Sequence, residues 1–207
     1  MAASLFCAER VTSPTTDEHL HLARGVAWWR APDTRLSWPH PPLGHIVAAA
    51  PAAILYDGPP IEGMRGYERA HMSRVALAYF GSYEQARFHL RTARWVMIGL
   101  ALLLGVYLHE WMRRRYGETL AIFATILYAA NPVLLGHAGL MTTDFPITLV
   151  TFFALLQLHD YLQTTTRWRT AALLLAIGGL VTAKLTGVLI ALLLLLPAIG
   201  FAIAGRG

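Results

Sequence analysis

The longest apolar stretch of the chain, from Ala171 to Ala204, constrains the fold more than any other feature of the sequence. It holds roughly 34 residues, whereas about 20 residues of helix cross a hydrocarbon core about 30 Å thick. We therefore expect two helices here, which turn near residues 184–187. Three further apolar runs precede this stretch: Trp95–Trp111, Thr119–Leu135 with a break near Asn131-Pro132, and Phe145–Leu162. The sequence thus predicts an all-α integral membrane protein with about five transmembrane helices.

Charge divides the chain into two parts. Only 14% of the residues are charged, against about 25% in soluble domains, and few of them follow Arg115. We expect residues 1–92 to form an extracytoplasmic first-loop region with short juxtamembrane helices, and residues 93–207 a truncated transmembrane helical bundle. Within the first part, apolar residues recur at helical spacing from Met72 to Tyr83. This stripe predicts either an amphipathic helix at the membrane surface or an ordinary helix packed on a neighbouring segment.

Positive charge predicts the orientation of the helices in the membrane. Arg113–Arg115, Arg167 with Arg169, and Arg206 fall in alternate connections between the apolar runs. The positive-inside rule places these connections in the cytoplasm. Residues 1–92, the loop 136–144 and the turn at Lys184 are then all expected outside.

Several other classes of protein fit the sequence poorly. The net charge of +5 does not predict nucleic-acid binding, because the arginines form no basic face with interleaved aromatic residues. Cys7 is the only cysteine, which excludes an internal disulfide and a cysteine-based zinc site. The segment Met1–Ala8 lacks the basic start of a signal peptide and is too short to span a membrane.

The first candidate motif joins Asp17 and Glu18 to His19 and His21. Carboxylates beside histidines can supply a general base and the group that orients it. A structural interpretation competes, because Thr15-x-x-Glu18 matches a capping box that opens a helix through Trp29. A metal site on His19 and His21 is a third possibility, although no third ligand is evident in the sequence.

Three further residues are candidates for a site, and each also has a structural explanation. His40 precedes Pro41-Pro42, which can simply form a rigid connector before a helix over residues 43–56. Asp144 suits a helix N-cap, with Pro146 in the first turn. Lys184 is the only lysine of the chain. It can snorkel to the membrane surface or hold a lipid-linked phosphate.

Together these segments resemble the GT-C superfamily of membrane glycosyltransferases, in particular its protein O-mannosyltransferase-like, phospholipid carrier-dependent branch. The resemblance rests on four motifs in order, which cover most of the chain. They are the Thr-x-Asp-Glu type motif at Thr15–Gly25, His-Pro-Pro-Leu at His40–Leu43, Asn131-Pro132 with the loop to Asp144, and Gly-Leu-x-x-x-Lys-x-x-Gly at Gly179–Gly187.

The resemblance implies inverting transfer of a sugar from a polyprenyl-phosphate-linked donor to an acceptor at the extracytoplasmic face of the plasma membrane. By this likeness Asp17 is the base that deprotonates the acceptor hydroxyl, or the group that orients it, with Glu18 beside it in the catalytic motif. The remaining candidates, His21, His40, Asp144 and Lys184, bind substrates, and Lys184 holds the carrier phosphate. The expected partners are the donor lipid, membrane lipids and an acceptor that the sequence does not specify. No cofactor and no metal are expected.

Members of this superfamily have a spanning helix before the Asp-Glu loop and further spans beyond the region matched here. We therefore expect the chain to be an N-terminal fragment of such an enzyme. Trp38-Pro39 also stands where many members carry an acidic residue. The alternatives are a non-enzymatic component of a transporter or flippase, in which Asp144 and Lys184 line a path through the membrane, and an inactive truncated member.

Overall fold

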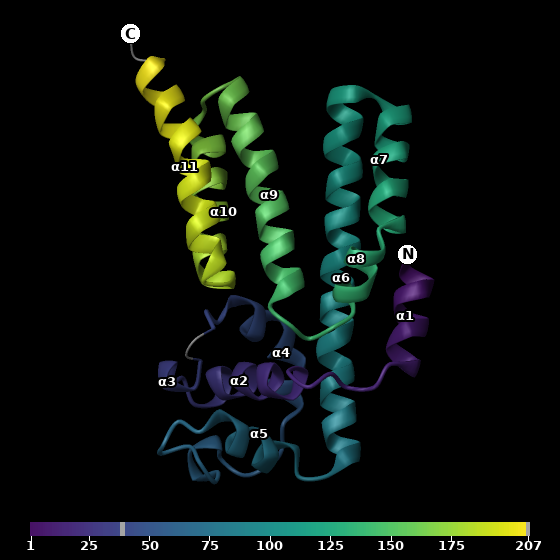
Figure 1. Cartoon of the computed structure of the whole chain (residues 1–207), viewed down its shortest axis with the longest axis vertical. Helices are drawn as coiled ribbons and strands as arrows, with labels where there is room; N and C mark the ends of the chain where they lie inside the picture. Colours follow the sequence, from purple (N-terminus) through teal and green to yellow (C-terminus); the bar gives the residue numbers. More distant parts are fainter. Residues whose placement is uncertain (38–39, 206–207) are drawn as a thin grey trace. The chain divides into compact units, whose positions relative to one another are not determined.

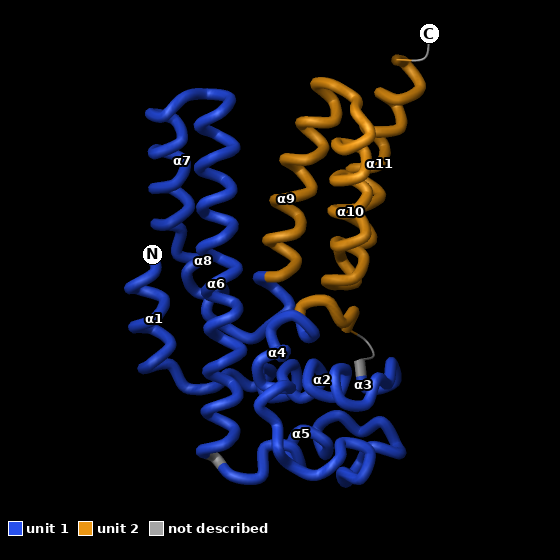
Figure 2. The backbone as a smooth tube through the Cα atoms, turned by 180° about the vertical axis from the view of Figure 1, so that it is seen from behind, with its two compact units in different colours: residues 1–36, 45–145 blue, residues 37–44, 146–207 orange. Residues whose placement is uncertain are grey.

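The computed structural model describes residues 1–37 and 40–205, and every regular element in these ranges is a helix. Trp38, Pro39 and Arg206, which the sequence analysis considered, lie outside them. The chain divides into two compact units (Figure 2). The first comprises residues 1–36 and 45–145, and the second residues 37–44 and 146–207. Each unit is described by itself below.

The first unit is built on the long helix α6, Tyr83–Tyr116, which is continuous over 34 residues. In Figure 1, α1 lies beside α6 on one side, and α2 and α5 lie beside its lower part on the other. The remaining helices of this part of the chain are short. Their bounds are α1 Ala2–Val11, α2 Glu18–Arg30, α3 Thr34–Ser37, α4 Leu43–Leu55, the 3-10 turn Ile61–Gly63, α5 Met72–Phe80, α7 Glu118–Ala130 and α8 Pro132–Ala138.

Both ends of α6 carry recognisable stop signals. The Ser82 hydroxyl caps its start and accepts a hydrogen bond from the Gln85 N–H. The helix ends before Gly117, whose φ of +85° suits glycine. This sharp turn lets α7 run back along α6, where the Tyr128 hydroxyl donates to the Ala101 carbonyl across 2.8 Å. The predicted run Trp95–Trp111 thus lies within one longer helix.

The predicted break at Asn131-Pro132 is confirmed. Helices α7 and α8 meet there at a bend of 62°. The Asn131 side chain accepts hydrogen bonds from the N–H groups of Val133 and Leu134. Pro132 occupies the first position of α8, where its missing N–H costs nothing.

The amphipathic segment after Met72 forms α5, Met72–Phe80. Its apolar face, which includes Val75, Ala76 and Tyr79, is buried. This face packs within the first unit, where α5 contacts α2 and α6. The helix is therefore a packed element of this unit, the second of the two expected alternatives. The side chain of Tyr83 lies outside the described part of the structure.

The second unit holds a small helical core. It contains most of α9, Asp144–Gln163, together with α10, Arg167–Ala183, and α11, Thr186–Ala204. The predicted turn within the long apolar stretch is confirmed, because α10 ends at Ala183 and α11 begins at Thr186. The core consists of small and branched side chains from the three helices, among them Ala154, Leu158, Ala176, Leu180 and Ala191.

Three helices in the described residues are long and apolar enough to cross a membrane, namely α6 from Glu84, α9 and α11. The bent pair α7 and α8 raises the number to four if it forms one span. Helix α10, with 17 residues, is shorter than the roughly 20 residues that cross a hydrocarbon core. The predicted class, an all-α integral membrane protein with shorter helices near its N-terminus, is confirmed. The three or four candidate spans of the described residues are fewer than the five expected.

Candidate functional site

The centre of the candidate site is a buried ion pair between Glu18 and Arg94. Glu18 is the first residue of α2, and Arg94 lies in α6. The Arg94 guanidinium donates to both carboxylate oxygens, from Nε to Oε1 across 2.9 Å and from Nη2 to Oε2 across 2.6 Å. The Glu18 side chain is 0% exposed and that of Arg94 only 3%. Such a bidentate pair fixes the angle between the two helices as well as their separation.

Two backbone groups complete the surroundings of the carboxylate. The N–H of Thr15 donates to Oε2 across 2.9 Å, and the N–H of Met141 donates to Oε1 across 2.8 Å. Burial alone would raise the pKa of Glu18. The hydrogen bonds from Arg94, Thr15 and Met141 outweigh this effect and hold the pKa below its ordinary value. Glu18 is therefore a carboxylate at neutral pH, with its hydrogen-bonding capacity fully used.

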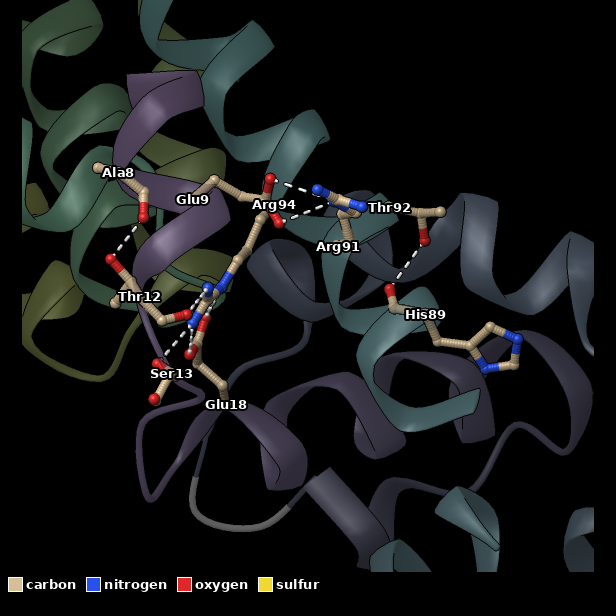
Figure 3. A network of polar contacts seen from close by, with 9 residues as sticks. All are labelled: Ala8, Glu9, Thr12, Ser13, Glu18, His89, Arg91, Thr92 and Arg94. Atoms are coloured by element: carbon tan, nitrogen blue, oxygen red, sulfur yellow. Dashed lines mark hydrogen bonds and ion pairs between the residues drawn. The ribbon is translucent and has the colours of Figure 1, made fainter. Parts of the chain in front are cut away.

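Arg94 also fixes the segment that leads into α2. Its Nη1 donates to the Thr12 carbonyl across 3.0 Å, and its Nη2 to the Ser13 carbonyl across 3.1 Å. Figure 3 shows the guanidinium between these carbonyls and the Glu18 carboxylate. One side chain of α6 therefore holds the loop between α1 and α2 at two points and the first residue of α2 at a third.

Asp17, the predicted base, sits at the N-cap position of α2 but makes no side-chain cap hydrogen bond. It is exposed, directly beside the buried Glu18. The predicted capping box is half formed. Glu18 reaches back to the Thr15 N–H, while the Thr15 hydroxyl is buried without a hydrogen-bond partner among the described residues. Asp17 is therefore exposed on a turn whose position is fixed by the hydrogen bonds of Glu18 to Thr15 and Arg94.

His21 lies one helical turn beyond Asp17 and is buried, with 6% exposure. Its Nδ1 is 2.7 Å from Nε2 of His45 in α4, so one nitrogen donates and the other accepts. The contact of α2 with α4 is close at this point. A side chain on Gly25 would collide with the His45 carbonyl oxygen and with Ala49. The histidine pair and the glycine together fix α2 against α4.

The other sequence candidates are distributed over both units. Asp144 is the first residue of α9 in the first unit, three positions after Met141, which donates to Glu18. His40 and Lys184 belong to the second unit. Lys184 is the extended residue that ends α10, and its carbonyl accepts a hydrogen bond from Gly187 across 2.8 Å. The structure thus brings Asp17, Glu18, His21 and the loop before Asp144 together in one unit.

A metal site finds no support in the described part of the chain, where no three His, Cys, Asp or Glu side chains form a group that could hold an ion. His21 pairs with His45, and the His19 ring lies 6.5 Å from that of Phe80. The metal-binding interpretation of His19 and His21 therefore gains no third ligand among these residues.

A family model described as dolichyl-phosphate-mannose-protein mannosyltransferase matches residues 81–206 of the chain. The match covers more than half of the sequence and includes Arg94, Asp144 and Lys184. The chain belongs to the dolichyl-phosphate-mannose-protein mannosyltransferase family. No curated protein and no solved structure gives a significant match.

Membership of the dolichyl-phosphate-mannose-protein mannosyltransferase family supports sugar transfer of the mannosyltransferase type, with a lipid-linked sugar donor and an acceptor in general terms. Together with its apolar helices, it makes the chain a multi-pass membrane protein. Asp17, Glu18, His21 and His40 precede the matched range, so their roles rest on the geometry and on the motifs.

Sequence reasoning missed two residues of this site, Arg94 and His45. Arg94 directly precedes the apolar run that starts at Trp95, a position where an arginine is typical of a membrane boundary. Arg91 lies three residues earlier, about one helical turn away, and the sequence gave no reason to expect different roles for Arg91 and Arg94. His45 offered a clearer signal, because it is the one ionisable residue in the otherwise apolar helix over Leu43–Leu55.

Proposed function

We propose that the chain transfers a sugar from a polyprenyl-phosphate-linked donor to an acceptor hydroxyl at the extracytoplasmic face of the plasma membrane, with inversion at the anomeric carbon. In this proposal residues 1–92 form the extracytoplasmic first-loop region, and residues 93–207 the transmembrane bundle. Asp17 is the base. Family membership supports the class of reaction, and the geometry around Glu18 supports the choice of base.

The observation that carries the proposal is the contrast between two adjacent carboxylates. Glu18 accepts four hydrogen bonds and is fully buried, so it cannot approach a substrate. Asp17 is exposed and its carboxylate has no hydrogen bond to the described residues. A general base needs a free lone pair and a fixed position. The pair of Glu18 with Arg94 supplies the position, and Asp17 supplies the lone pair.

The proposed step is a single displacement. Asp17 accepts the proton of the acceptor hydroxyl as its oxygen forms a bond to the anomeric carbon. The bond from that carbon to the carrier phosphate breaks, and the phosphate leaves with the electron pair. In this scheme the Lys184 ammonium stabilises the charge on the phosphate, while His40 and Asp144 shape the substrate site. The buried His21 supports the site indirectly, because its contact with His45 holds α2 in place. One base opposite the leaving group is sufficient for inversion.

A transfer assay in membranes tests this proposal, with radiolabelled polyprenyl-phosphate mannose as donor. We expect Asp17→Asn to lower transfer at least about hundredfold, which is the usual contribution of a general base. Asp57→Asn serves as the matched control, because Asp57 is also an exposed acid of the first unit. Equal transfer by the Asp17→Asn variant and the unaltered chain would overturn the assignment of the base.

The same assay separates the proposal from its alternatives. Absence of transfer by the folded, inserted and unaltered chain would favour an inactive family member. Movement of a lipid-linked sugar between leaflets without transfer, insensitive to Asp17→Asn, would favour a flippase component.

A further inference from the structure

A second polar site lies between α1 and α6, next to the pair of Glu18 and Arg94, and shares Arg94 with it. It is a pocket of about 110 Å³, far above the roughly 10–15 Å³ that one water molecule requires. Four arginines line it with a single acid, Glu9; the other lining residues come from the end of α1, the loop after it and the first turns of α6. The arginines are Arg10, Arg87, Arg91 and Arg94.

Two of these arginines are neutralised within the protein. Arg94 is paired with Glu18 across 2.6 Å. Arg91 donates from Nε to both oxygens of Glu9, which lies 3.2 Å away and whose side chain is only 7% exposed (Figure 3). The Nη groups of Arg91 make no hydrogen bond to the described residues, so they keep donors available.

The other two arginines carry uncompensated charge. Arg10 and Arg87 are exposed, and neither forms a hydrogen bond or ion pair with any part of the chain that the structure describes. The pocket therefore holds two net positive charges and several unused N–H donors. Arginine presents its donors as a planar fork that matches the oxygens of a phosphate group. This combination favours an anion with several oxygens.

The position of the pocket along α6 indicates the source of that anion. The apolar run of α6 starts at Trp95, and Arg87 lies eight residues before it. At about 1.5 Å per residue, the lining residues of α6 lie between about 1.5 Å (Arg94) and about 12 Å (Arg87) from the start of this apolar run along the helix axis. Phospholipid headgroups extend several ångströms beyond the hydrocarbon core. If the core begins at the apolar run, Arg91 and Arg94 lie at headgroup level, and the long side chain of Arg87 can reach back toward it.

Exposed apolar residues at the rim of the pocket and near it also suit a lipid. Val11, which lines the pocket at the end of α1, is 84% exposed. In α6, Phe88 and Trp95 directly follow Arg87 and Arg94 and are 53% and 48% exposed. Arg91 lies over the Trp95 ring at 5.8 Å. Exposed aromatic rings beside arginines are typical of the membrane interface.

We propose that the pocket between α1 and α6 binds the phosphate of an anionic phospholipid headgroup, held by Arg10, Arg87 and the free amino groups of Arg91. The site is separate from the proposed reaction at Asp17, because Arg94 is already engaged by Glu18 and by the carbonyls of Thr12 and Ser13. Its occupation would fix α1 against α6 at the level of the headgroups.

The test uses the full chain, purified in detergent and delipidated, with lipid binding measured by native mass spectrometry. Phosphatidylglycerol is the anionic probe and phosphatidylcholine the neutral one. The double variant Arg10→Gln/Arg87→Gln should bind phosphatidylglycerol at least about tenfold more weakly than the unaltered chain. The matched control is Arg65→Gln/Arg69→Gln, which removes the same charge from exposed positions in the loop before α5 and should change nothing.

A competition experiment identifies the source of the phosphate. Inorganic phosphate should displace phosphatidylglycerol only at concentrations at least about a hundredfold above those of the lipid, because it lacks acyl chains to contact the rim. Equal affinities for inorganic phosphate and phosphatidylglycerol would overturn the lipid assignment. Unchanged lipid binding in the Arg10→Gln/Arg87→Gln variant, or an equal loss in the control, would overturn the site itself.

Discussion

Among single residues, Glu18 and Arg94 have the largest expected effect on stability. Removing one member of a buried pair leaves the other charged and unpaired, at a cost of about 3–5 kcal/mol. We expect Glu18→Gln and Arg94→Gln each to lower the free energy of unfolding by roughly this amount. The double variant should lose less than the sum of the two. Unfolding in detergent of the unaltered chain, the two single variants and the double variant measures these differences.

The two ion pairs that Glu110 forms with Arg113 and Arg114 are a suitable control, because they lie on an exposed part of α6. Exposed ion pairs contribute little to stability, so Glu110→Gln should change it little. Strict additivity in the cycle of Glu18 and Arg94 would show that the two side chains do not interact, and would contradict the structure.

The pH dependence of stability should report the same carboxylate. The pKa of Glu18 is lower in the folded protein than its ordinary value of 4.5. Its contribution is therefore complete above pH 4.5 and is lost as the pH falls through the lower pKa of the folded state. The stability difference between the unaltered chain and Glu18→Gln, measured in steps from neutral to strongly acidic pH, should shrink in this range. A difference that grows on acidification would contradict the prediction.

The sequence singled out Asp17 and Glu18 as candidates, but it could not predict what they contact. Asp17 and Glu18 are adjacent and chemically alike, and the pattern alone could not show that one is buried and the other exposed. That difference depends on Arg94, which lies 76 positions further along the chain than Glu18. No local pattern encodes a contact of this range, so the pairing required the structure.

At the level of helices, Gly187 controls the turn between α10 and α11. A side chain there would collide with the Leu180 carbonyl group, which belongs to rigid helix backbone. We expect Gly187→Ala to destabilise the protein by about 1–3 kcal/mol through overpacking, as measured by thermal unfolding in detergent. Gly178→Ala is the matched control, because no atom lies within 4 Å of the added methyl group. Alanine also favours a helix over glycine, so the control should be neutral or slightly stabilising.

The helices themselves followed largely from the sequence. The apolar runs predicted the helices. The Asn131-Pro132 break and the turn at Lys184 each correspond to an observed helix boundary. The start of α6 did not follow, because its first turns are polar and carry several charges. Their helical structure depends on the Ser82 cap and on packing against α1 and α2. Hydropathy detects neither.

At the level of the whole molecule, the family match and the motif that contains the proposed base lie in different parts of the chain. The family match covers residues 81–206, whereas the proposed base lies before this range. The buried pair joins them, because Arg94 belongs to the matched region and Glu18 to α2, which precedes it. The proposed transfer therefore requires that Asp17 lies on the side of the membrane at which the lipid-linked donor is presented.

Cysteine labelling tests this orientation directly. Cys7→Ser removes the only cysteine of the chain. Single cysteines are then placed at Glu62, in the exposed loop after α4, and at Thr165, in the exposed connection between α9 and α10. A membrane-impermeant maleimide should label Glu62→Cys in intact cells, and Thr165→Cys only after permeabilisation, because the neighbouring Arg167 and Arg169 favour the cytoplasm. The reverse pattern would place Asp17 in the cytoplasm and exclude transfer at the outer face. Labelling of both positions in intact cells would place them on the same side, and would require an even number of crossings between the first loop and Thr165.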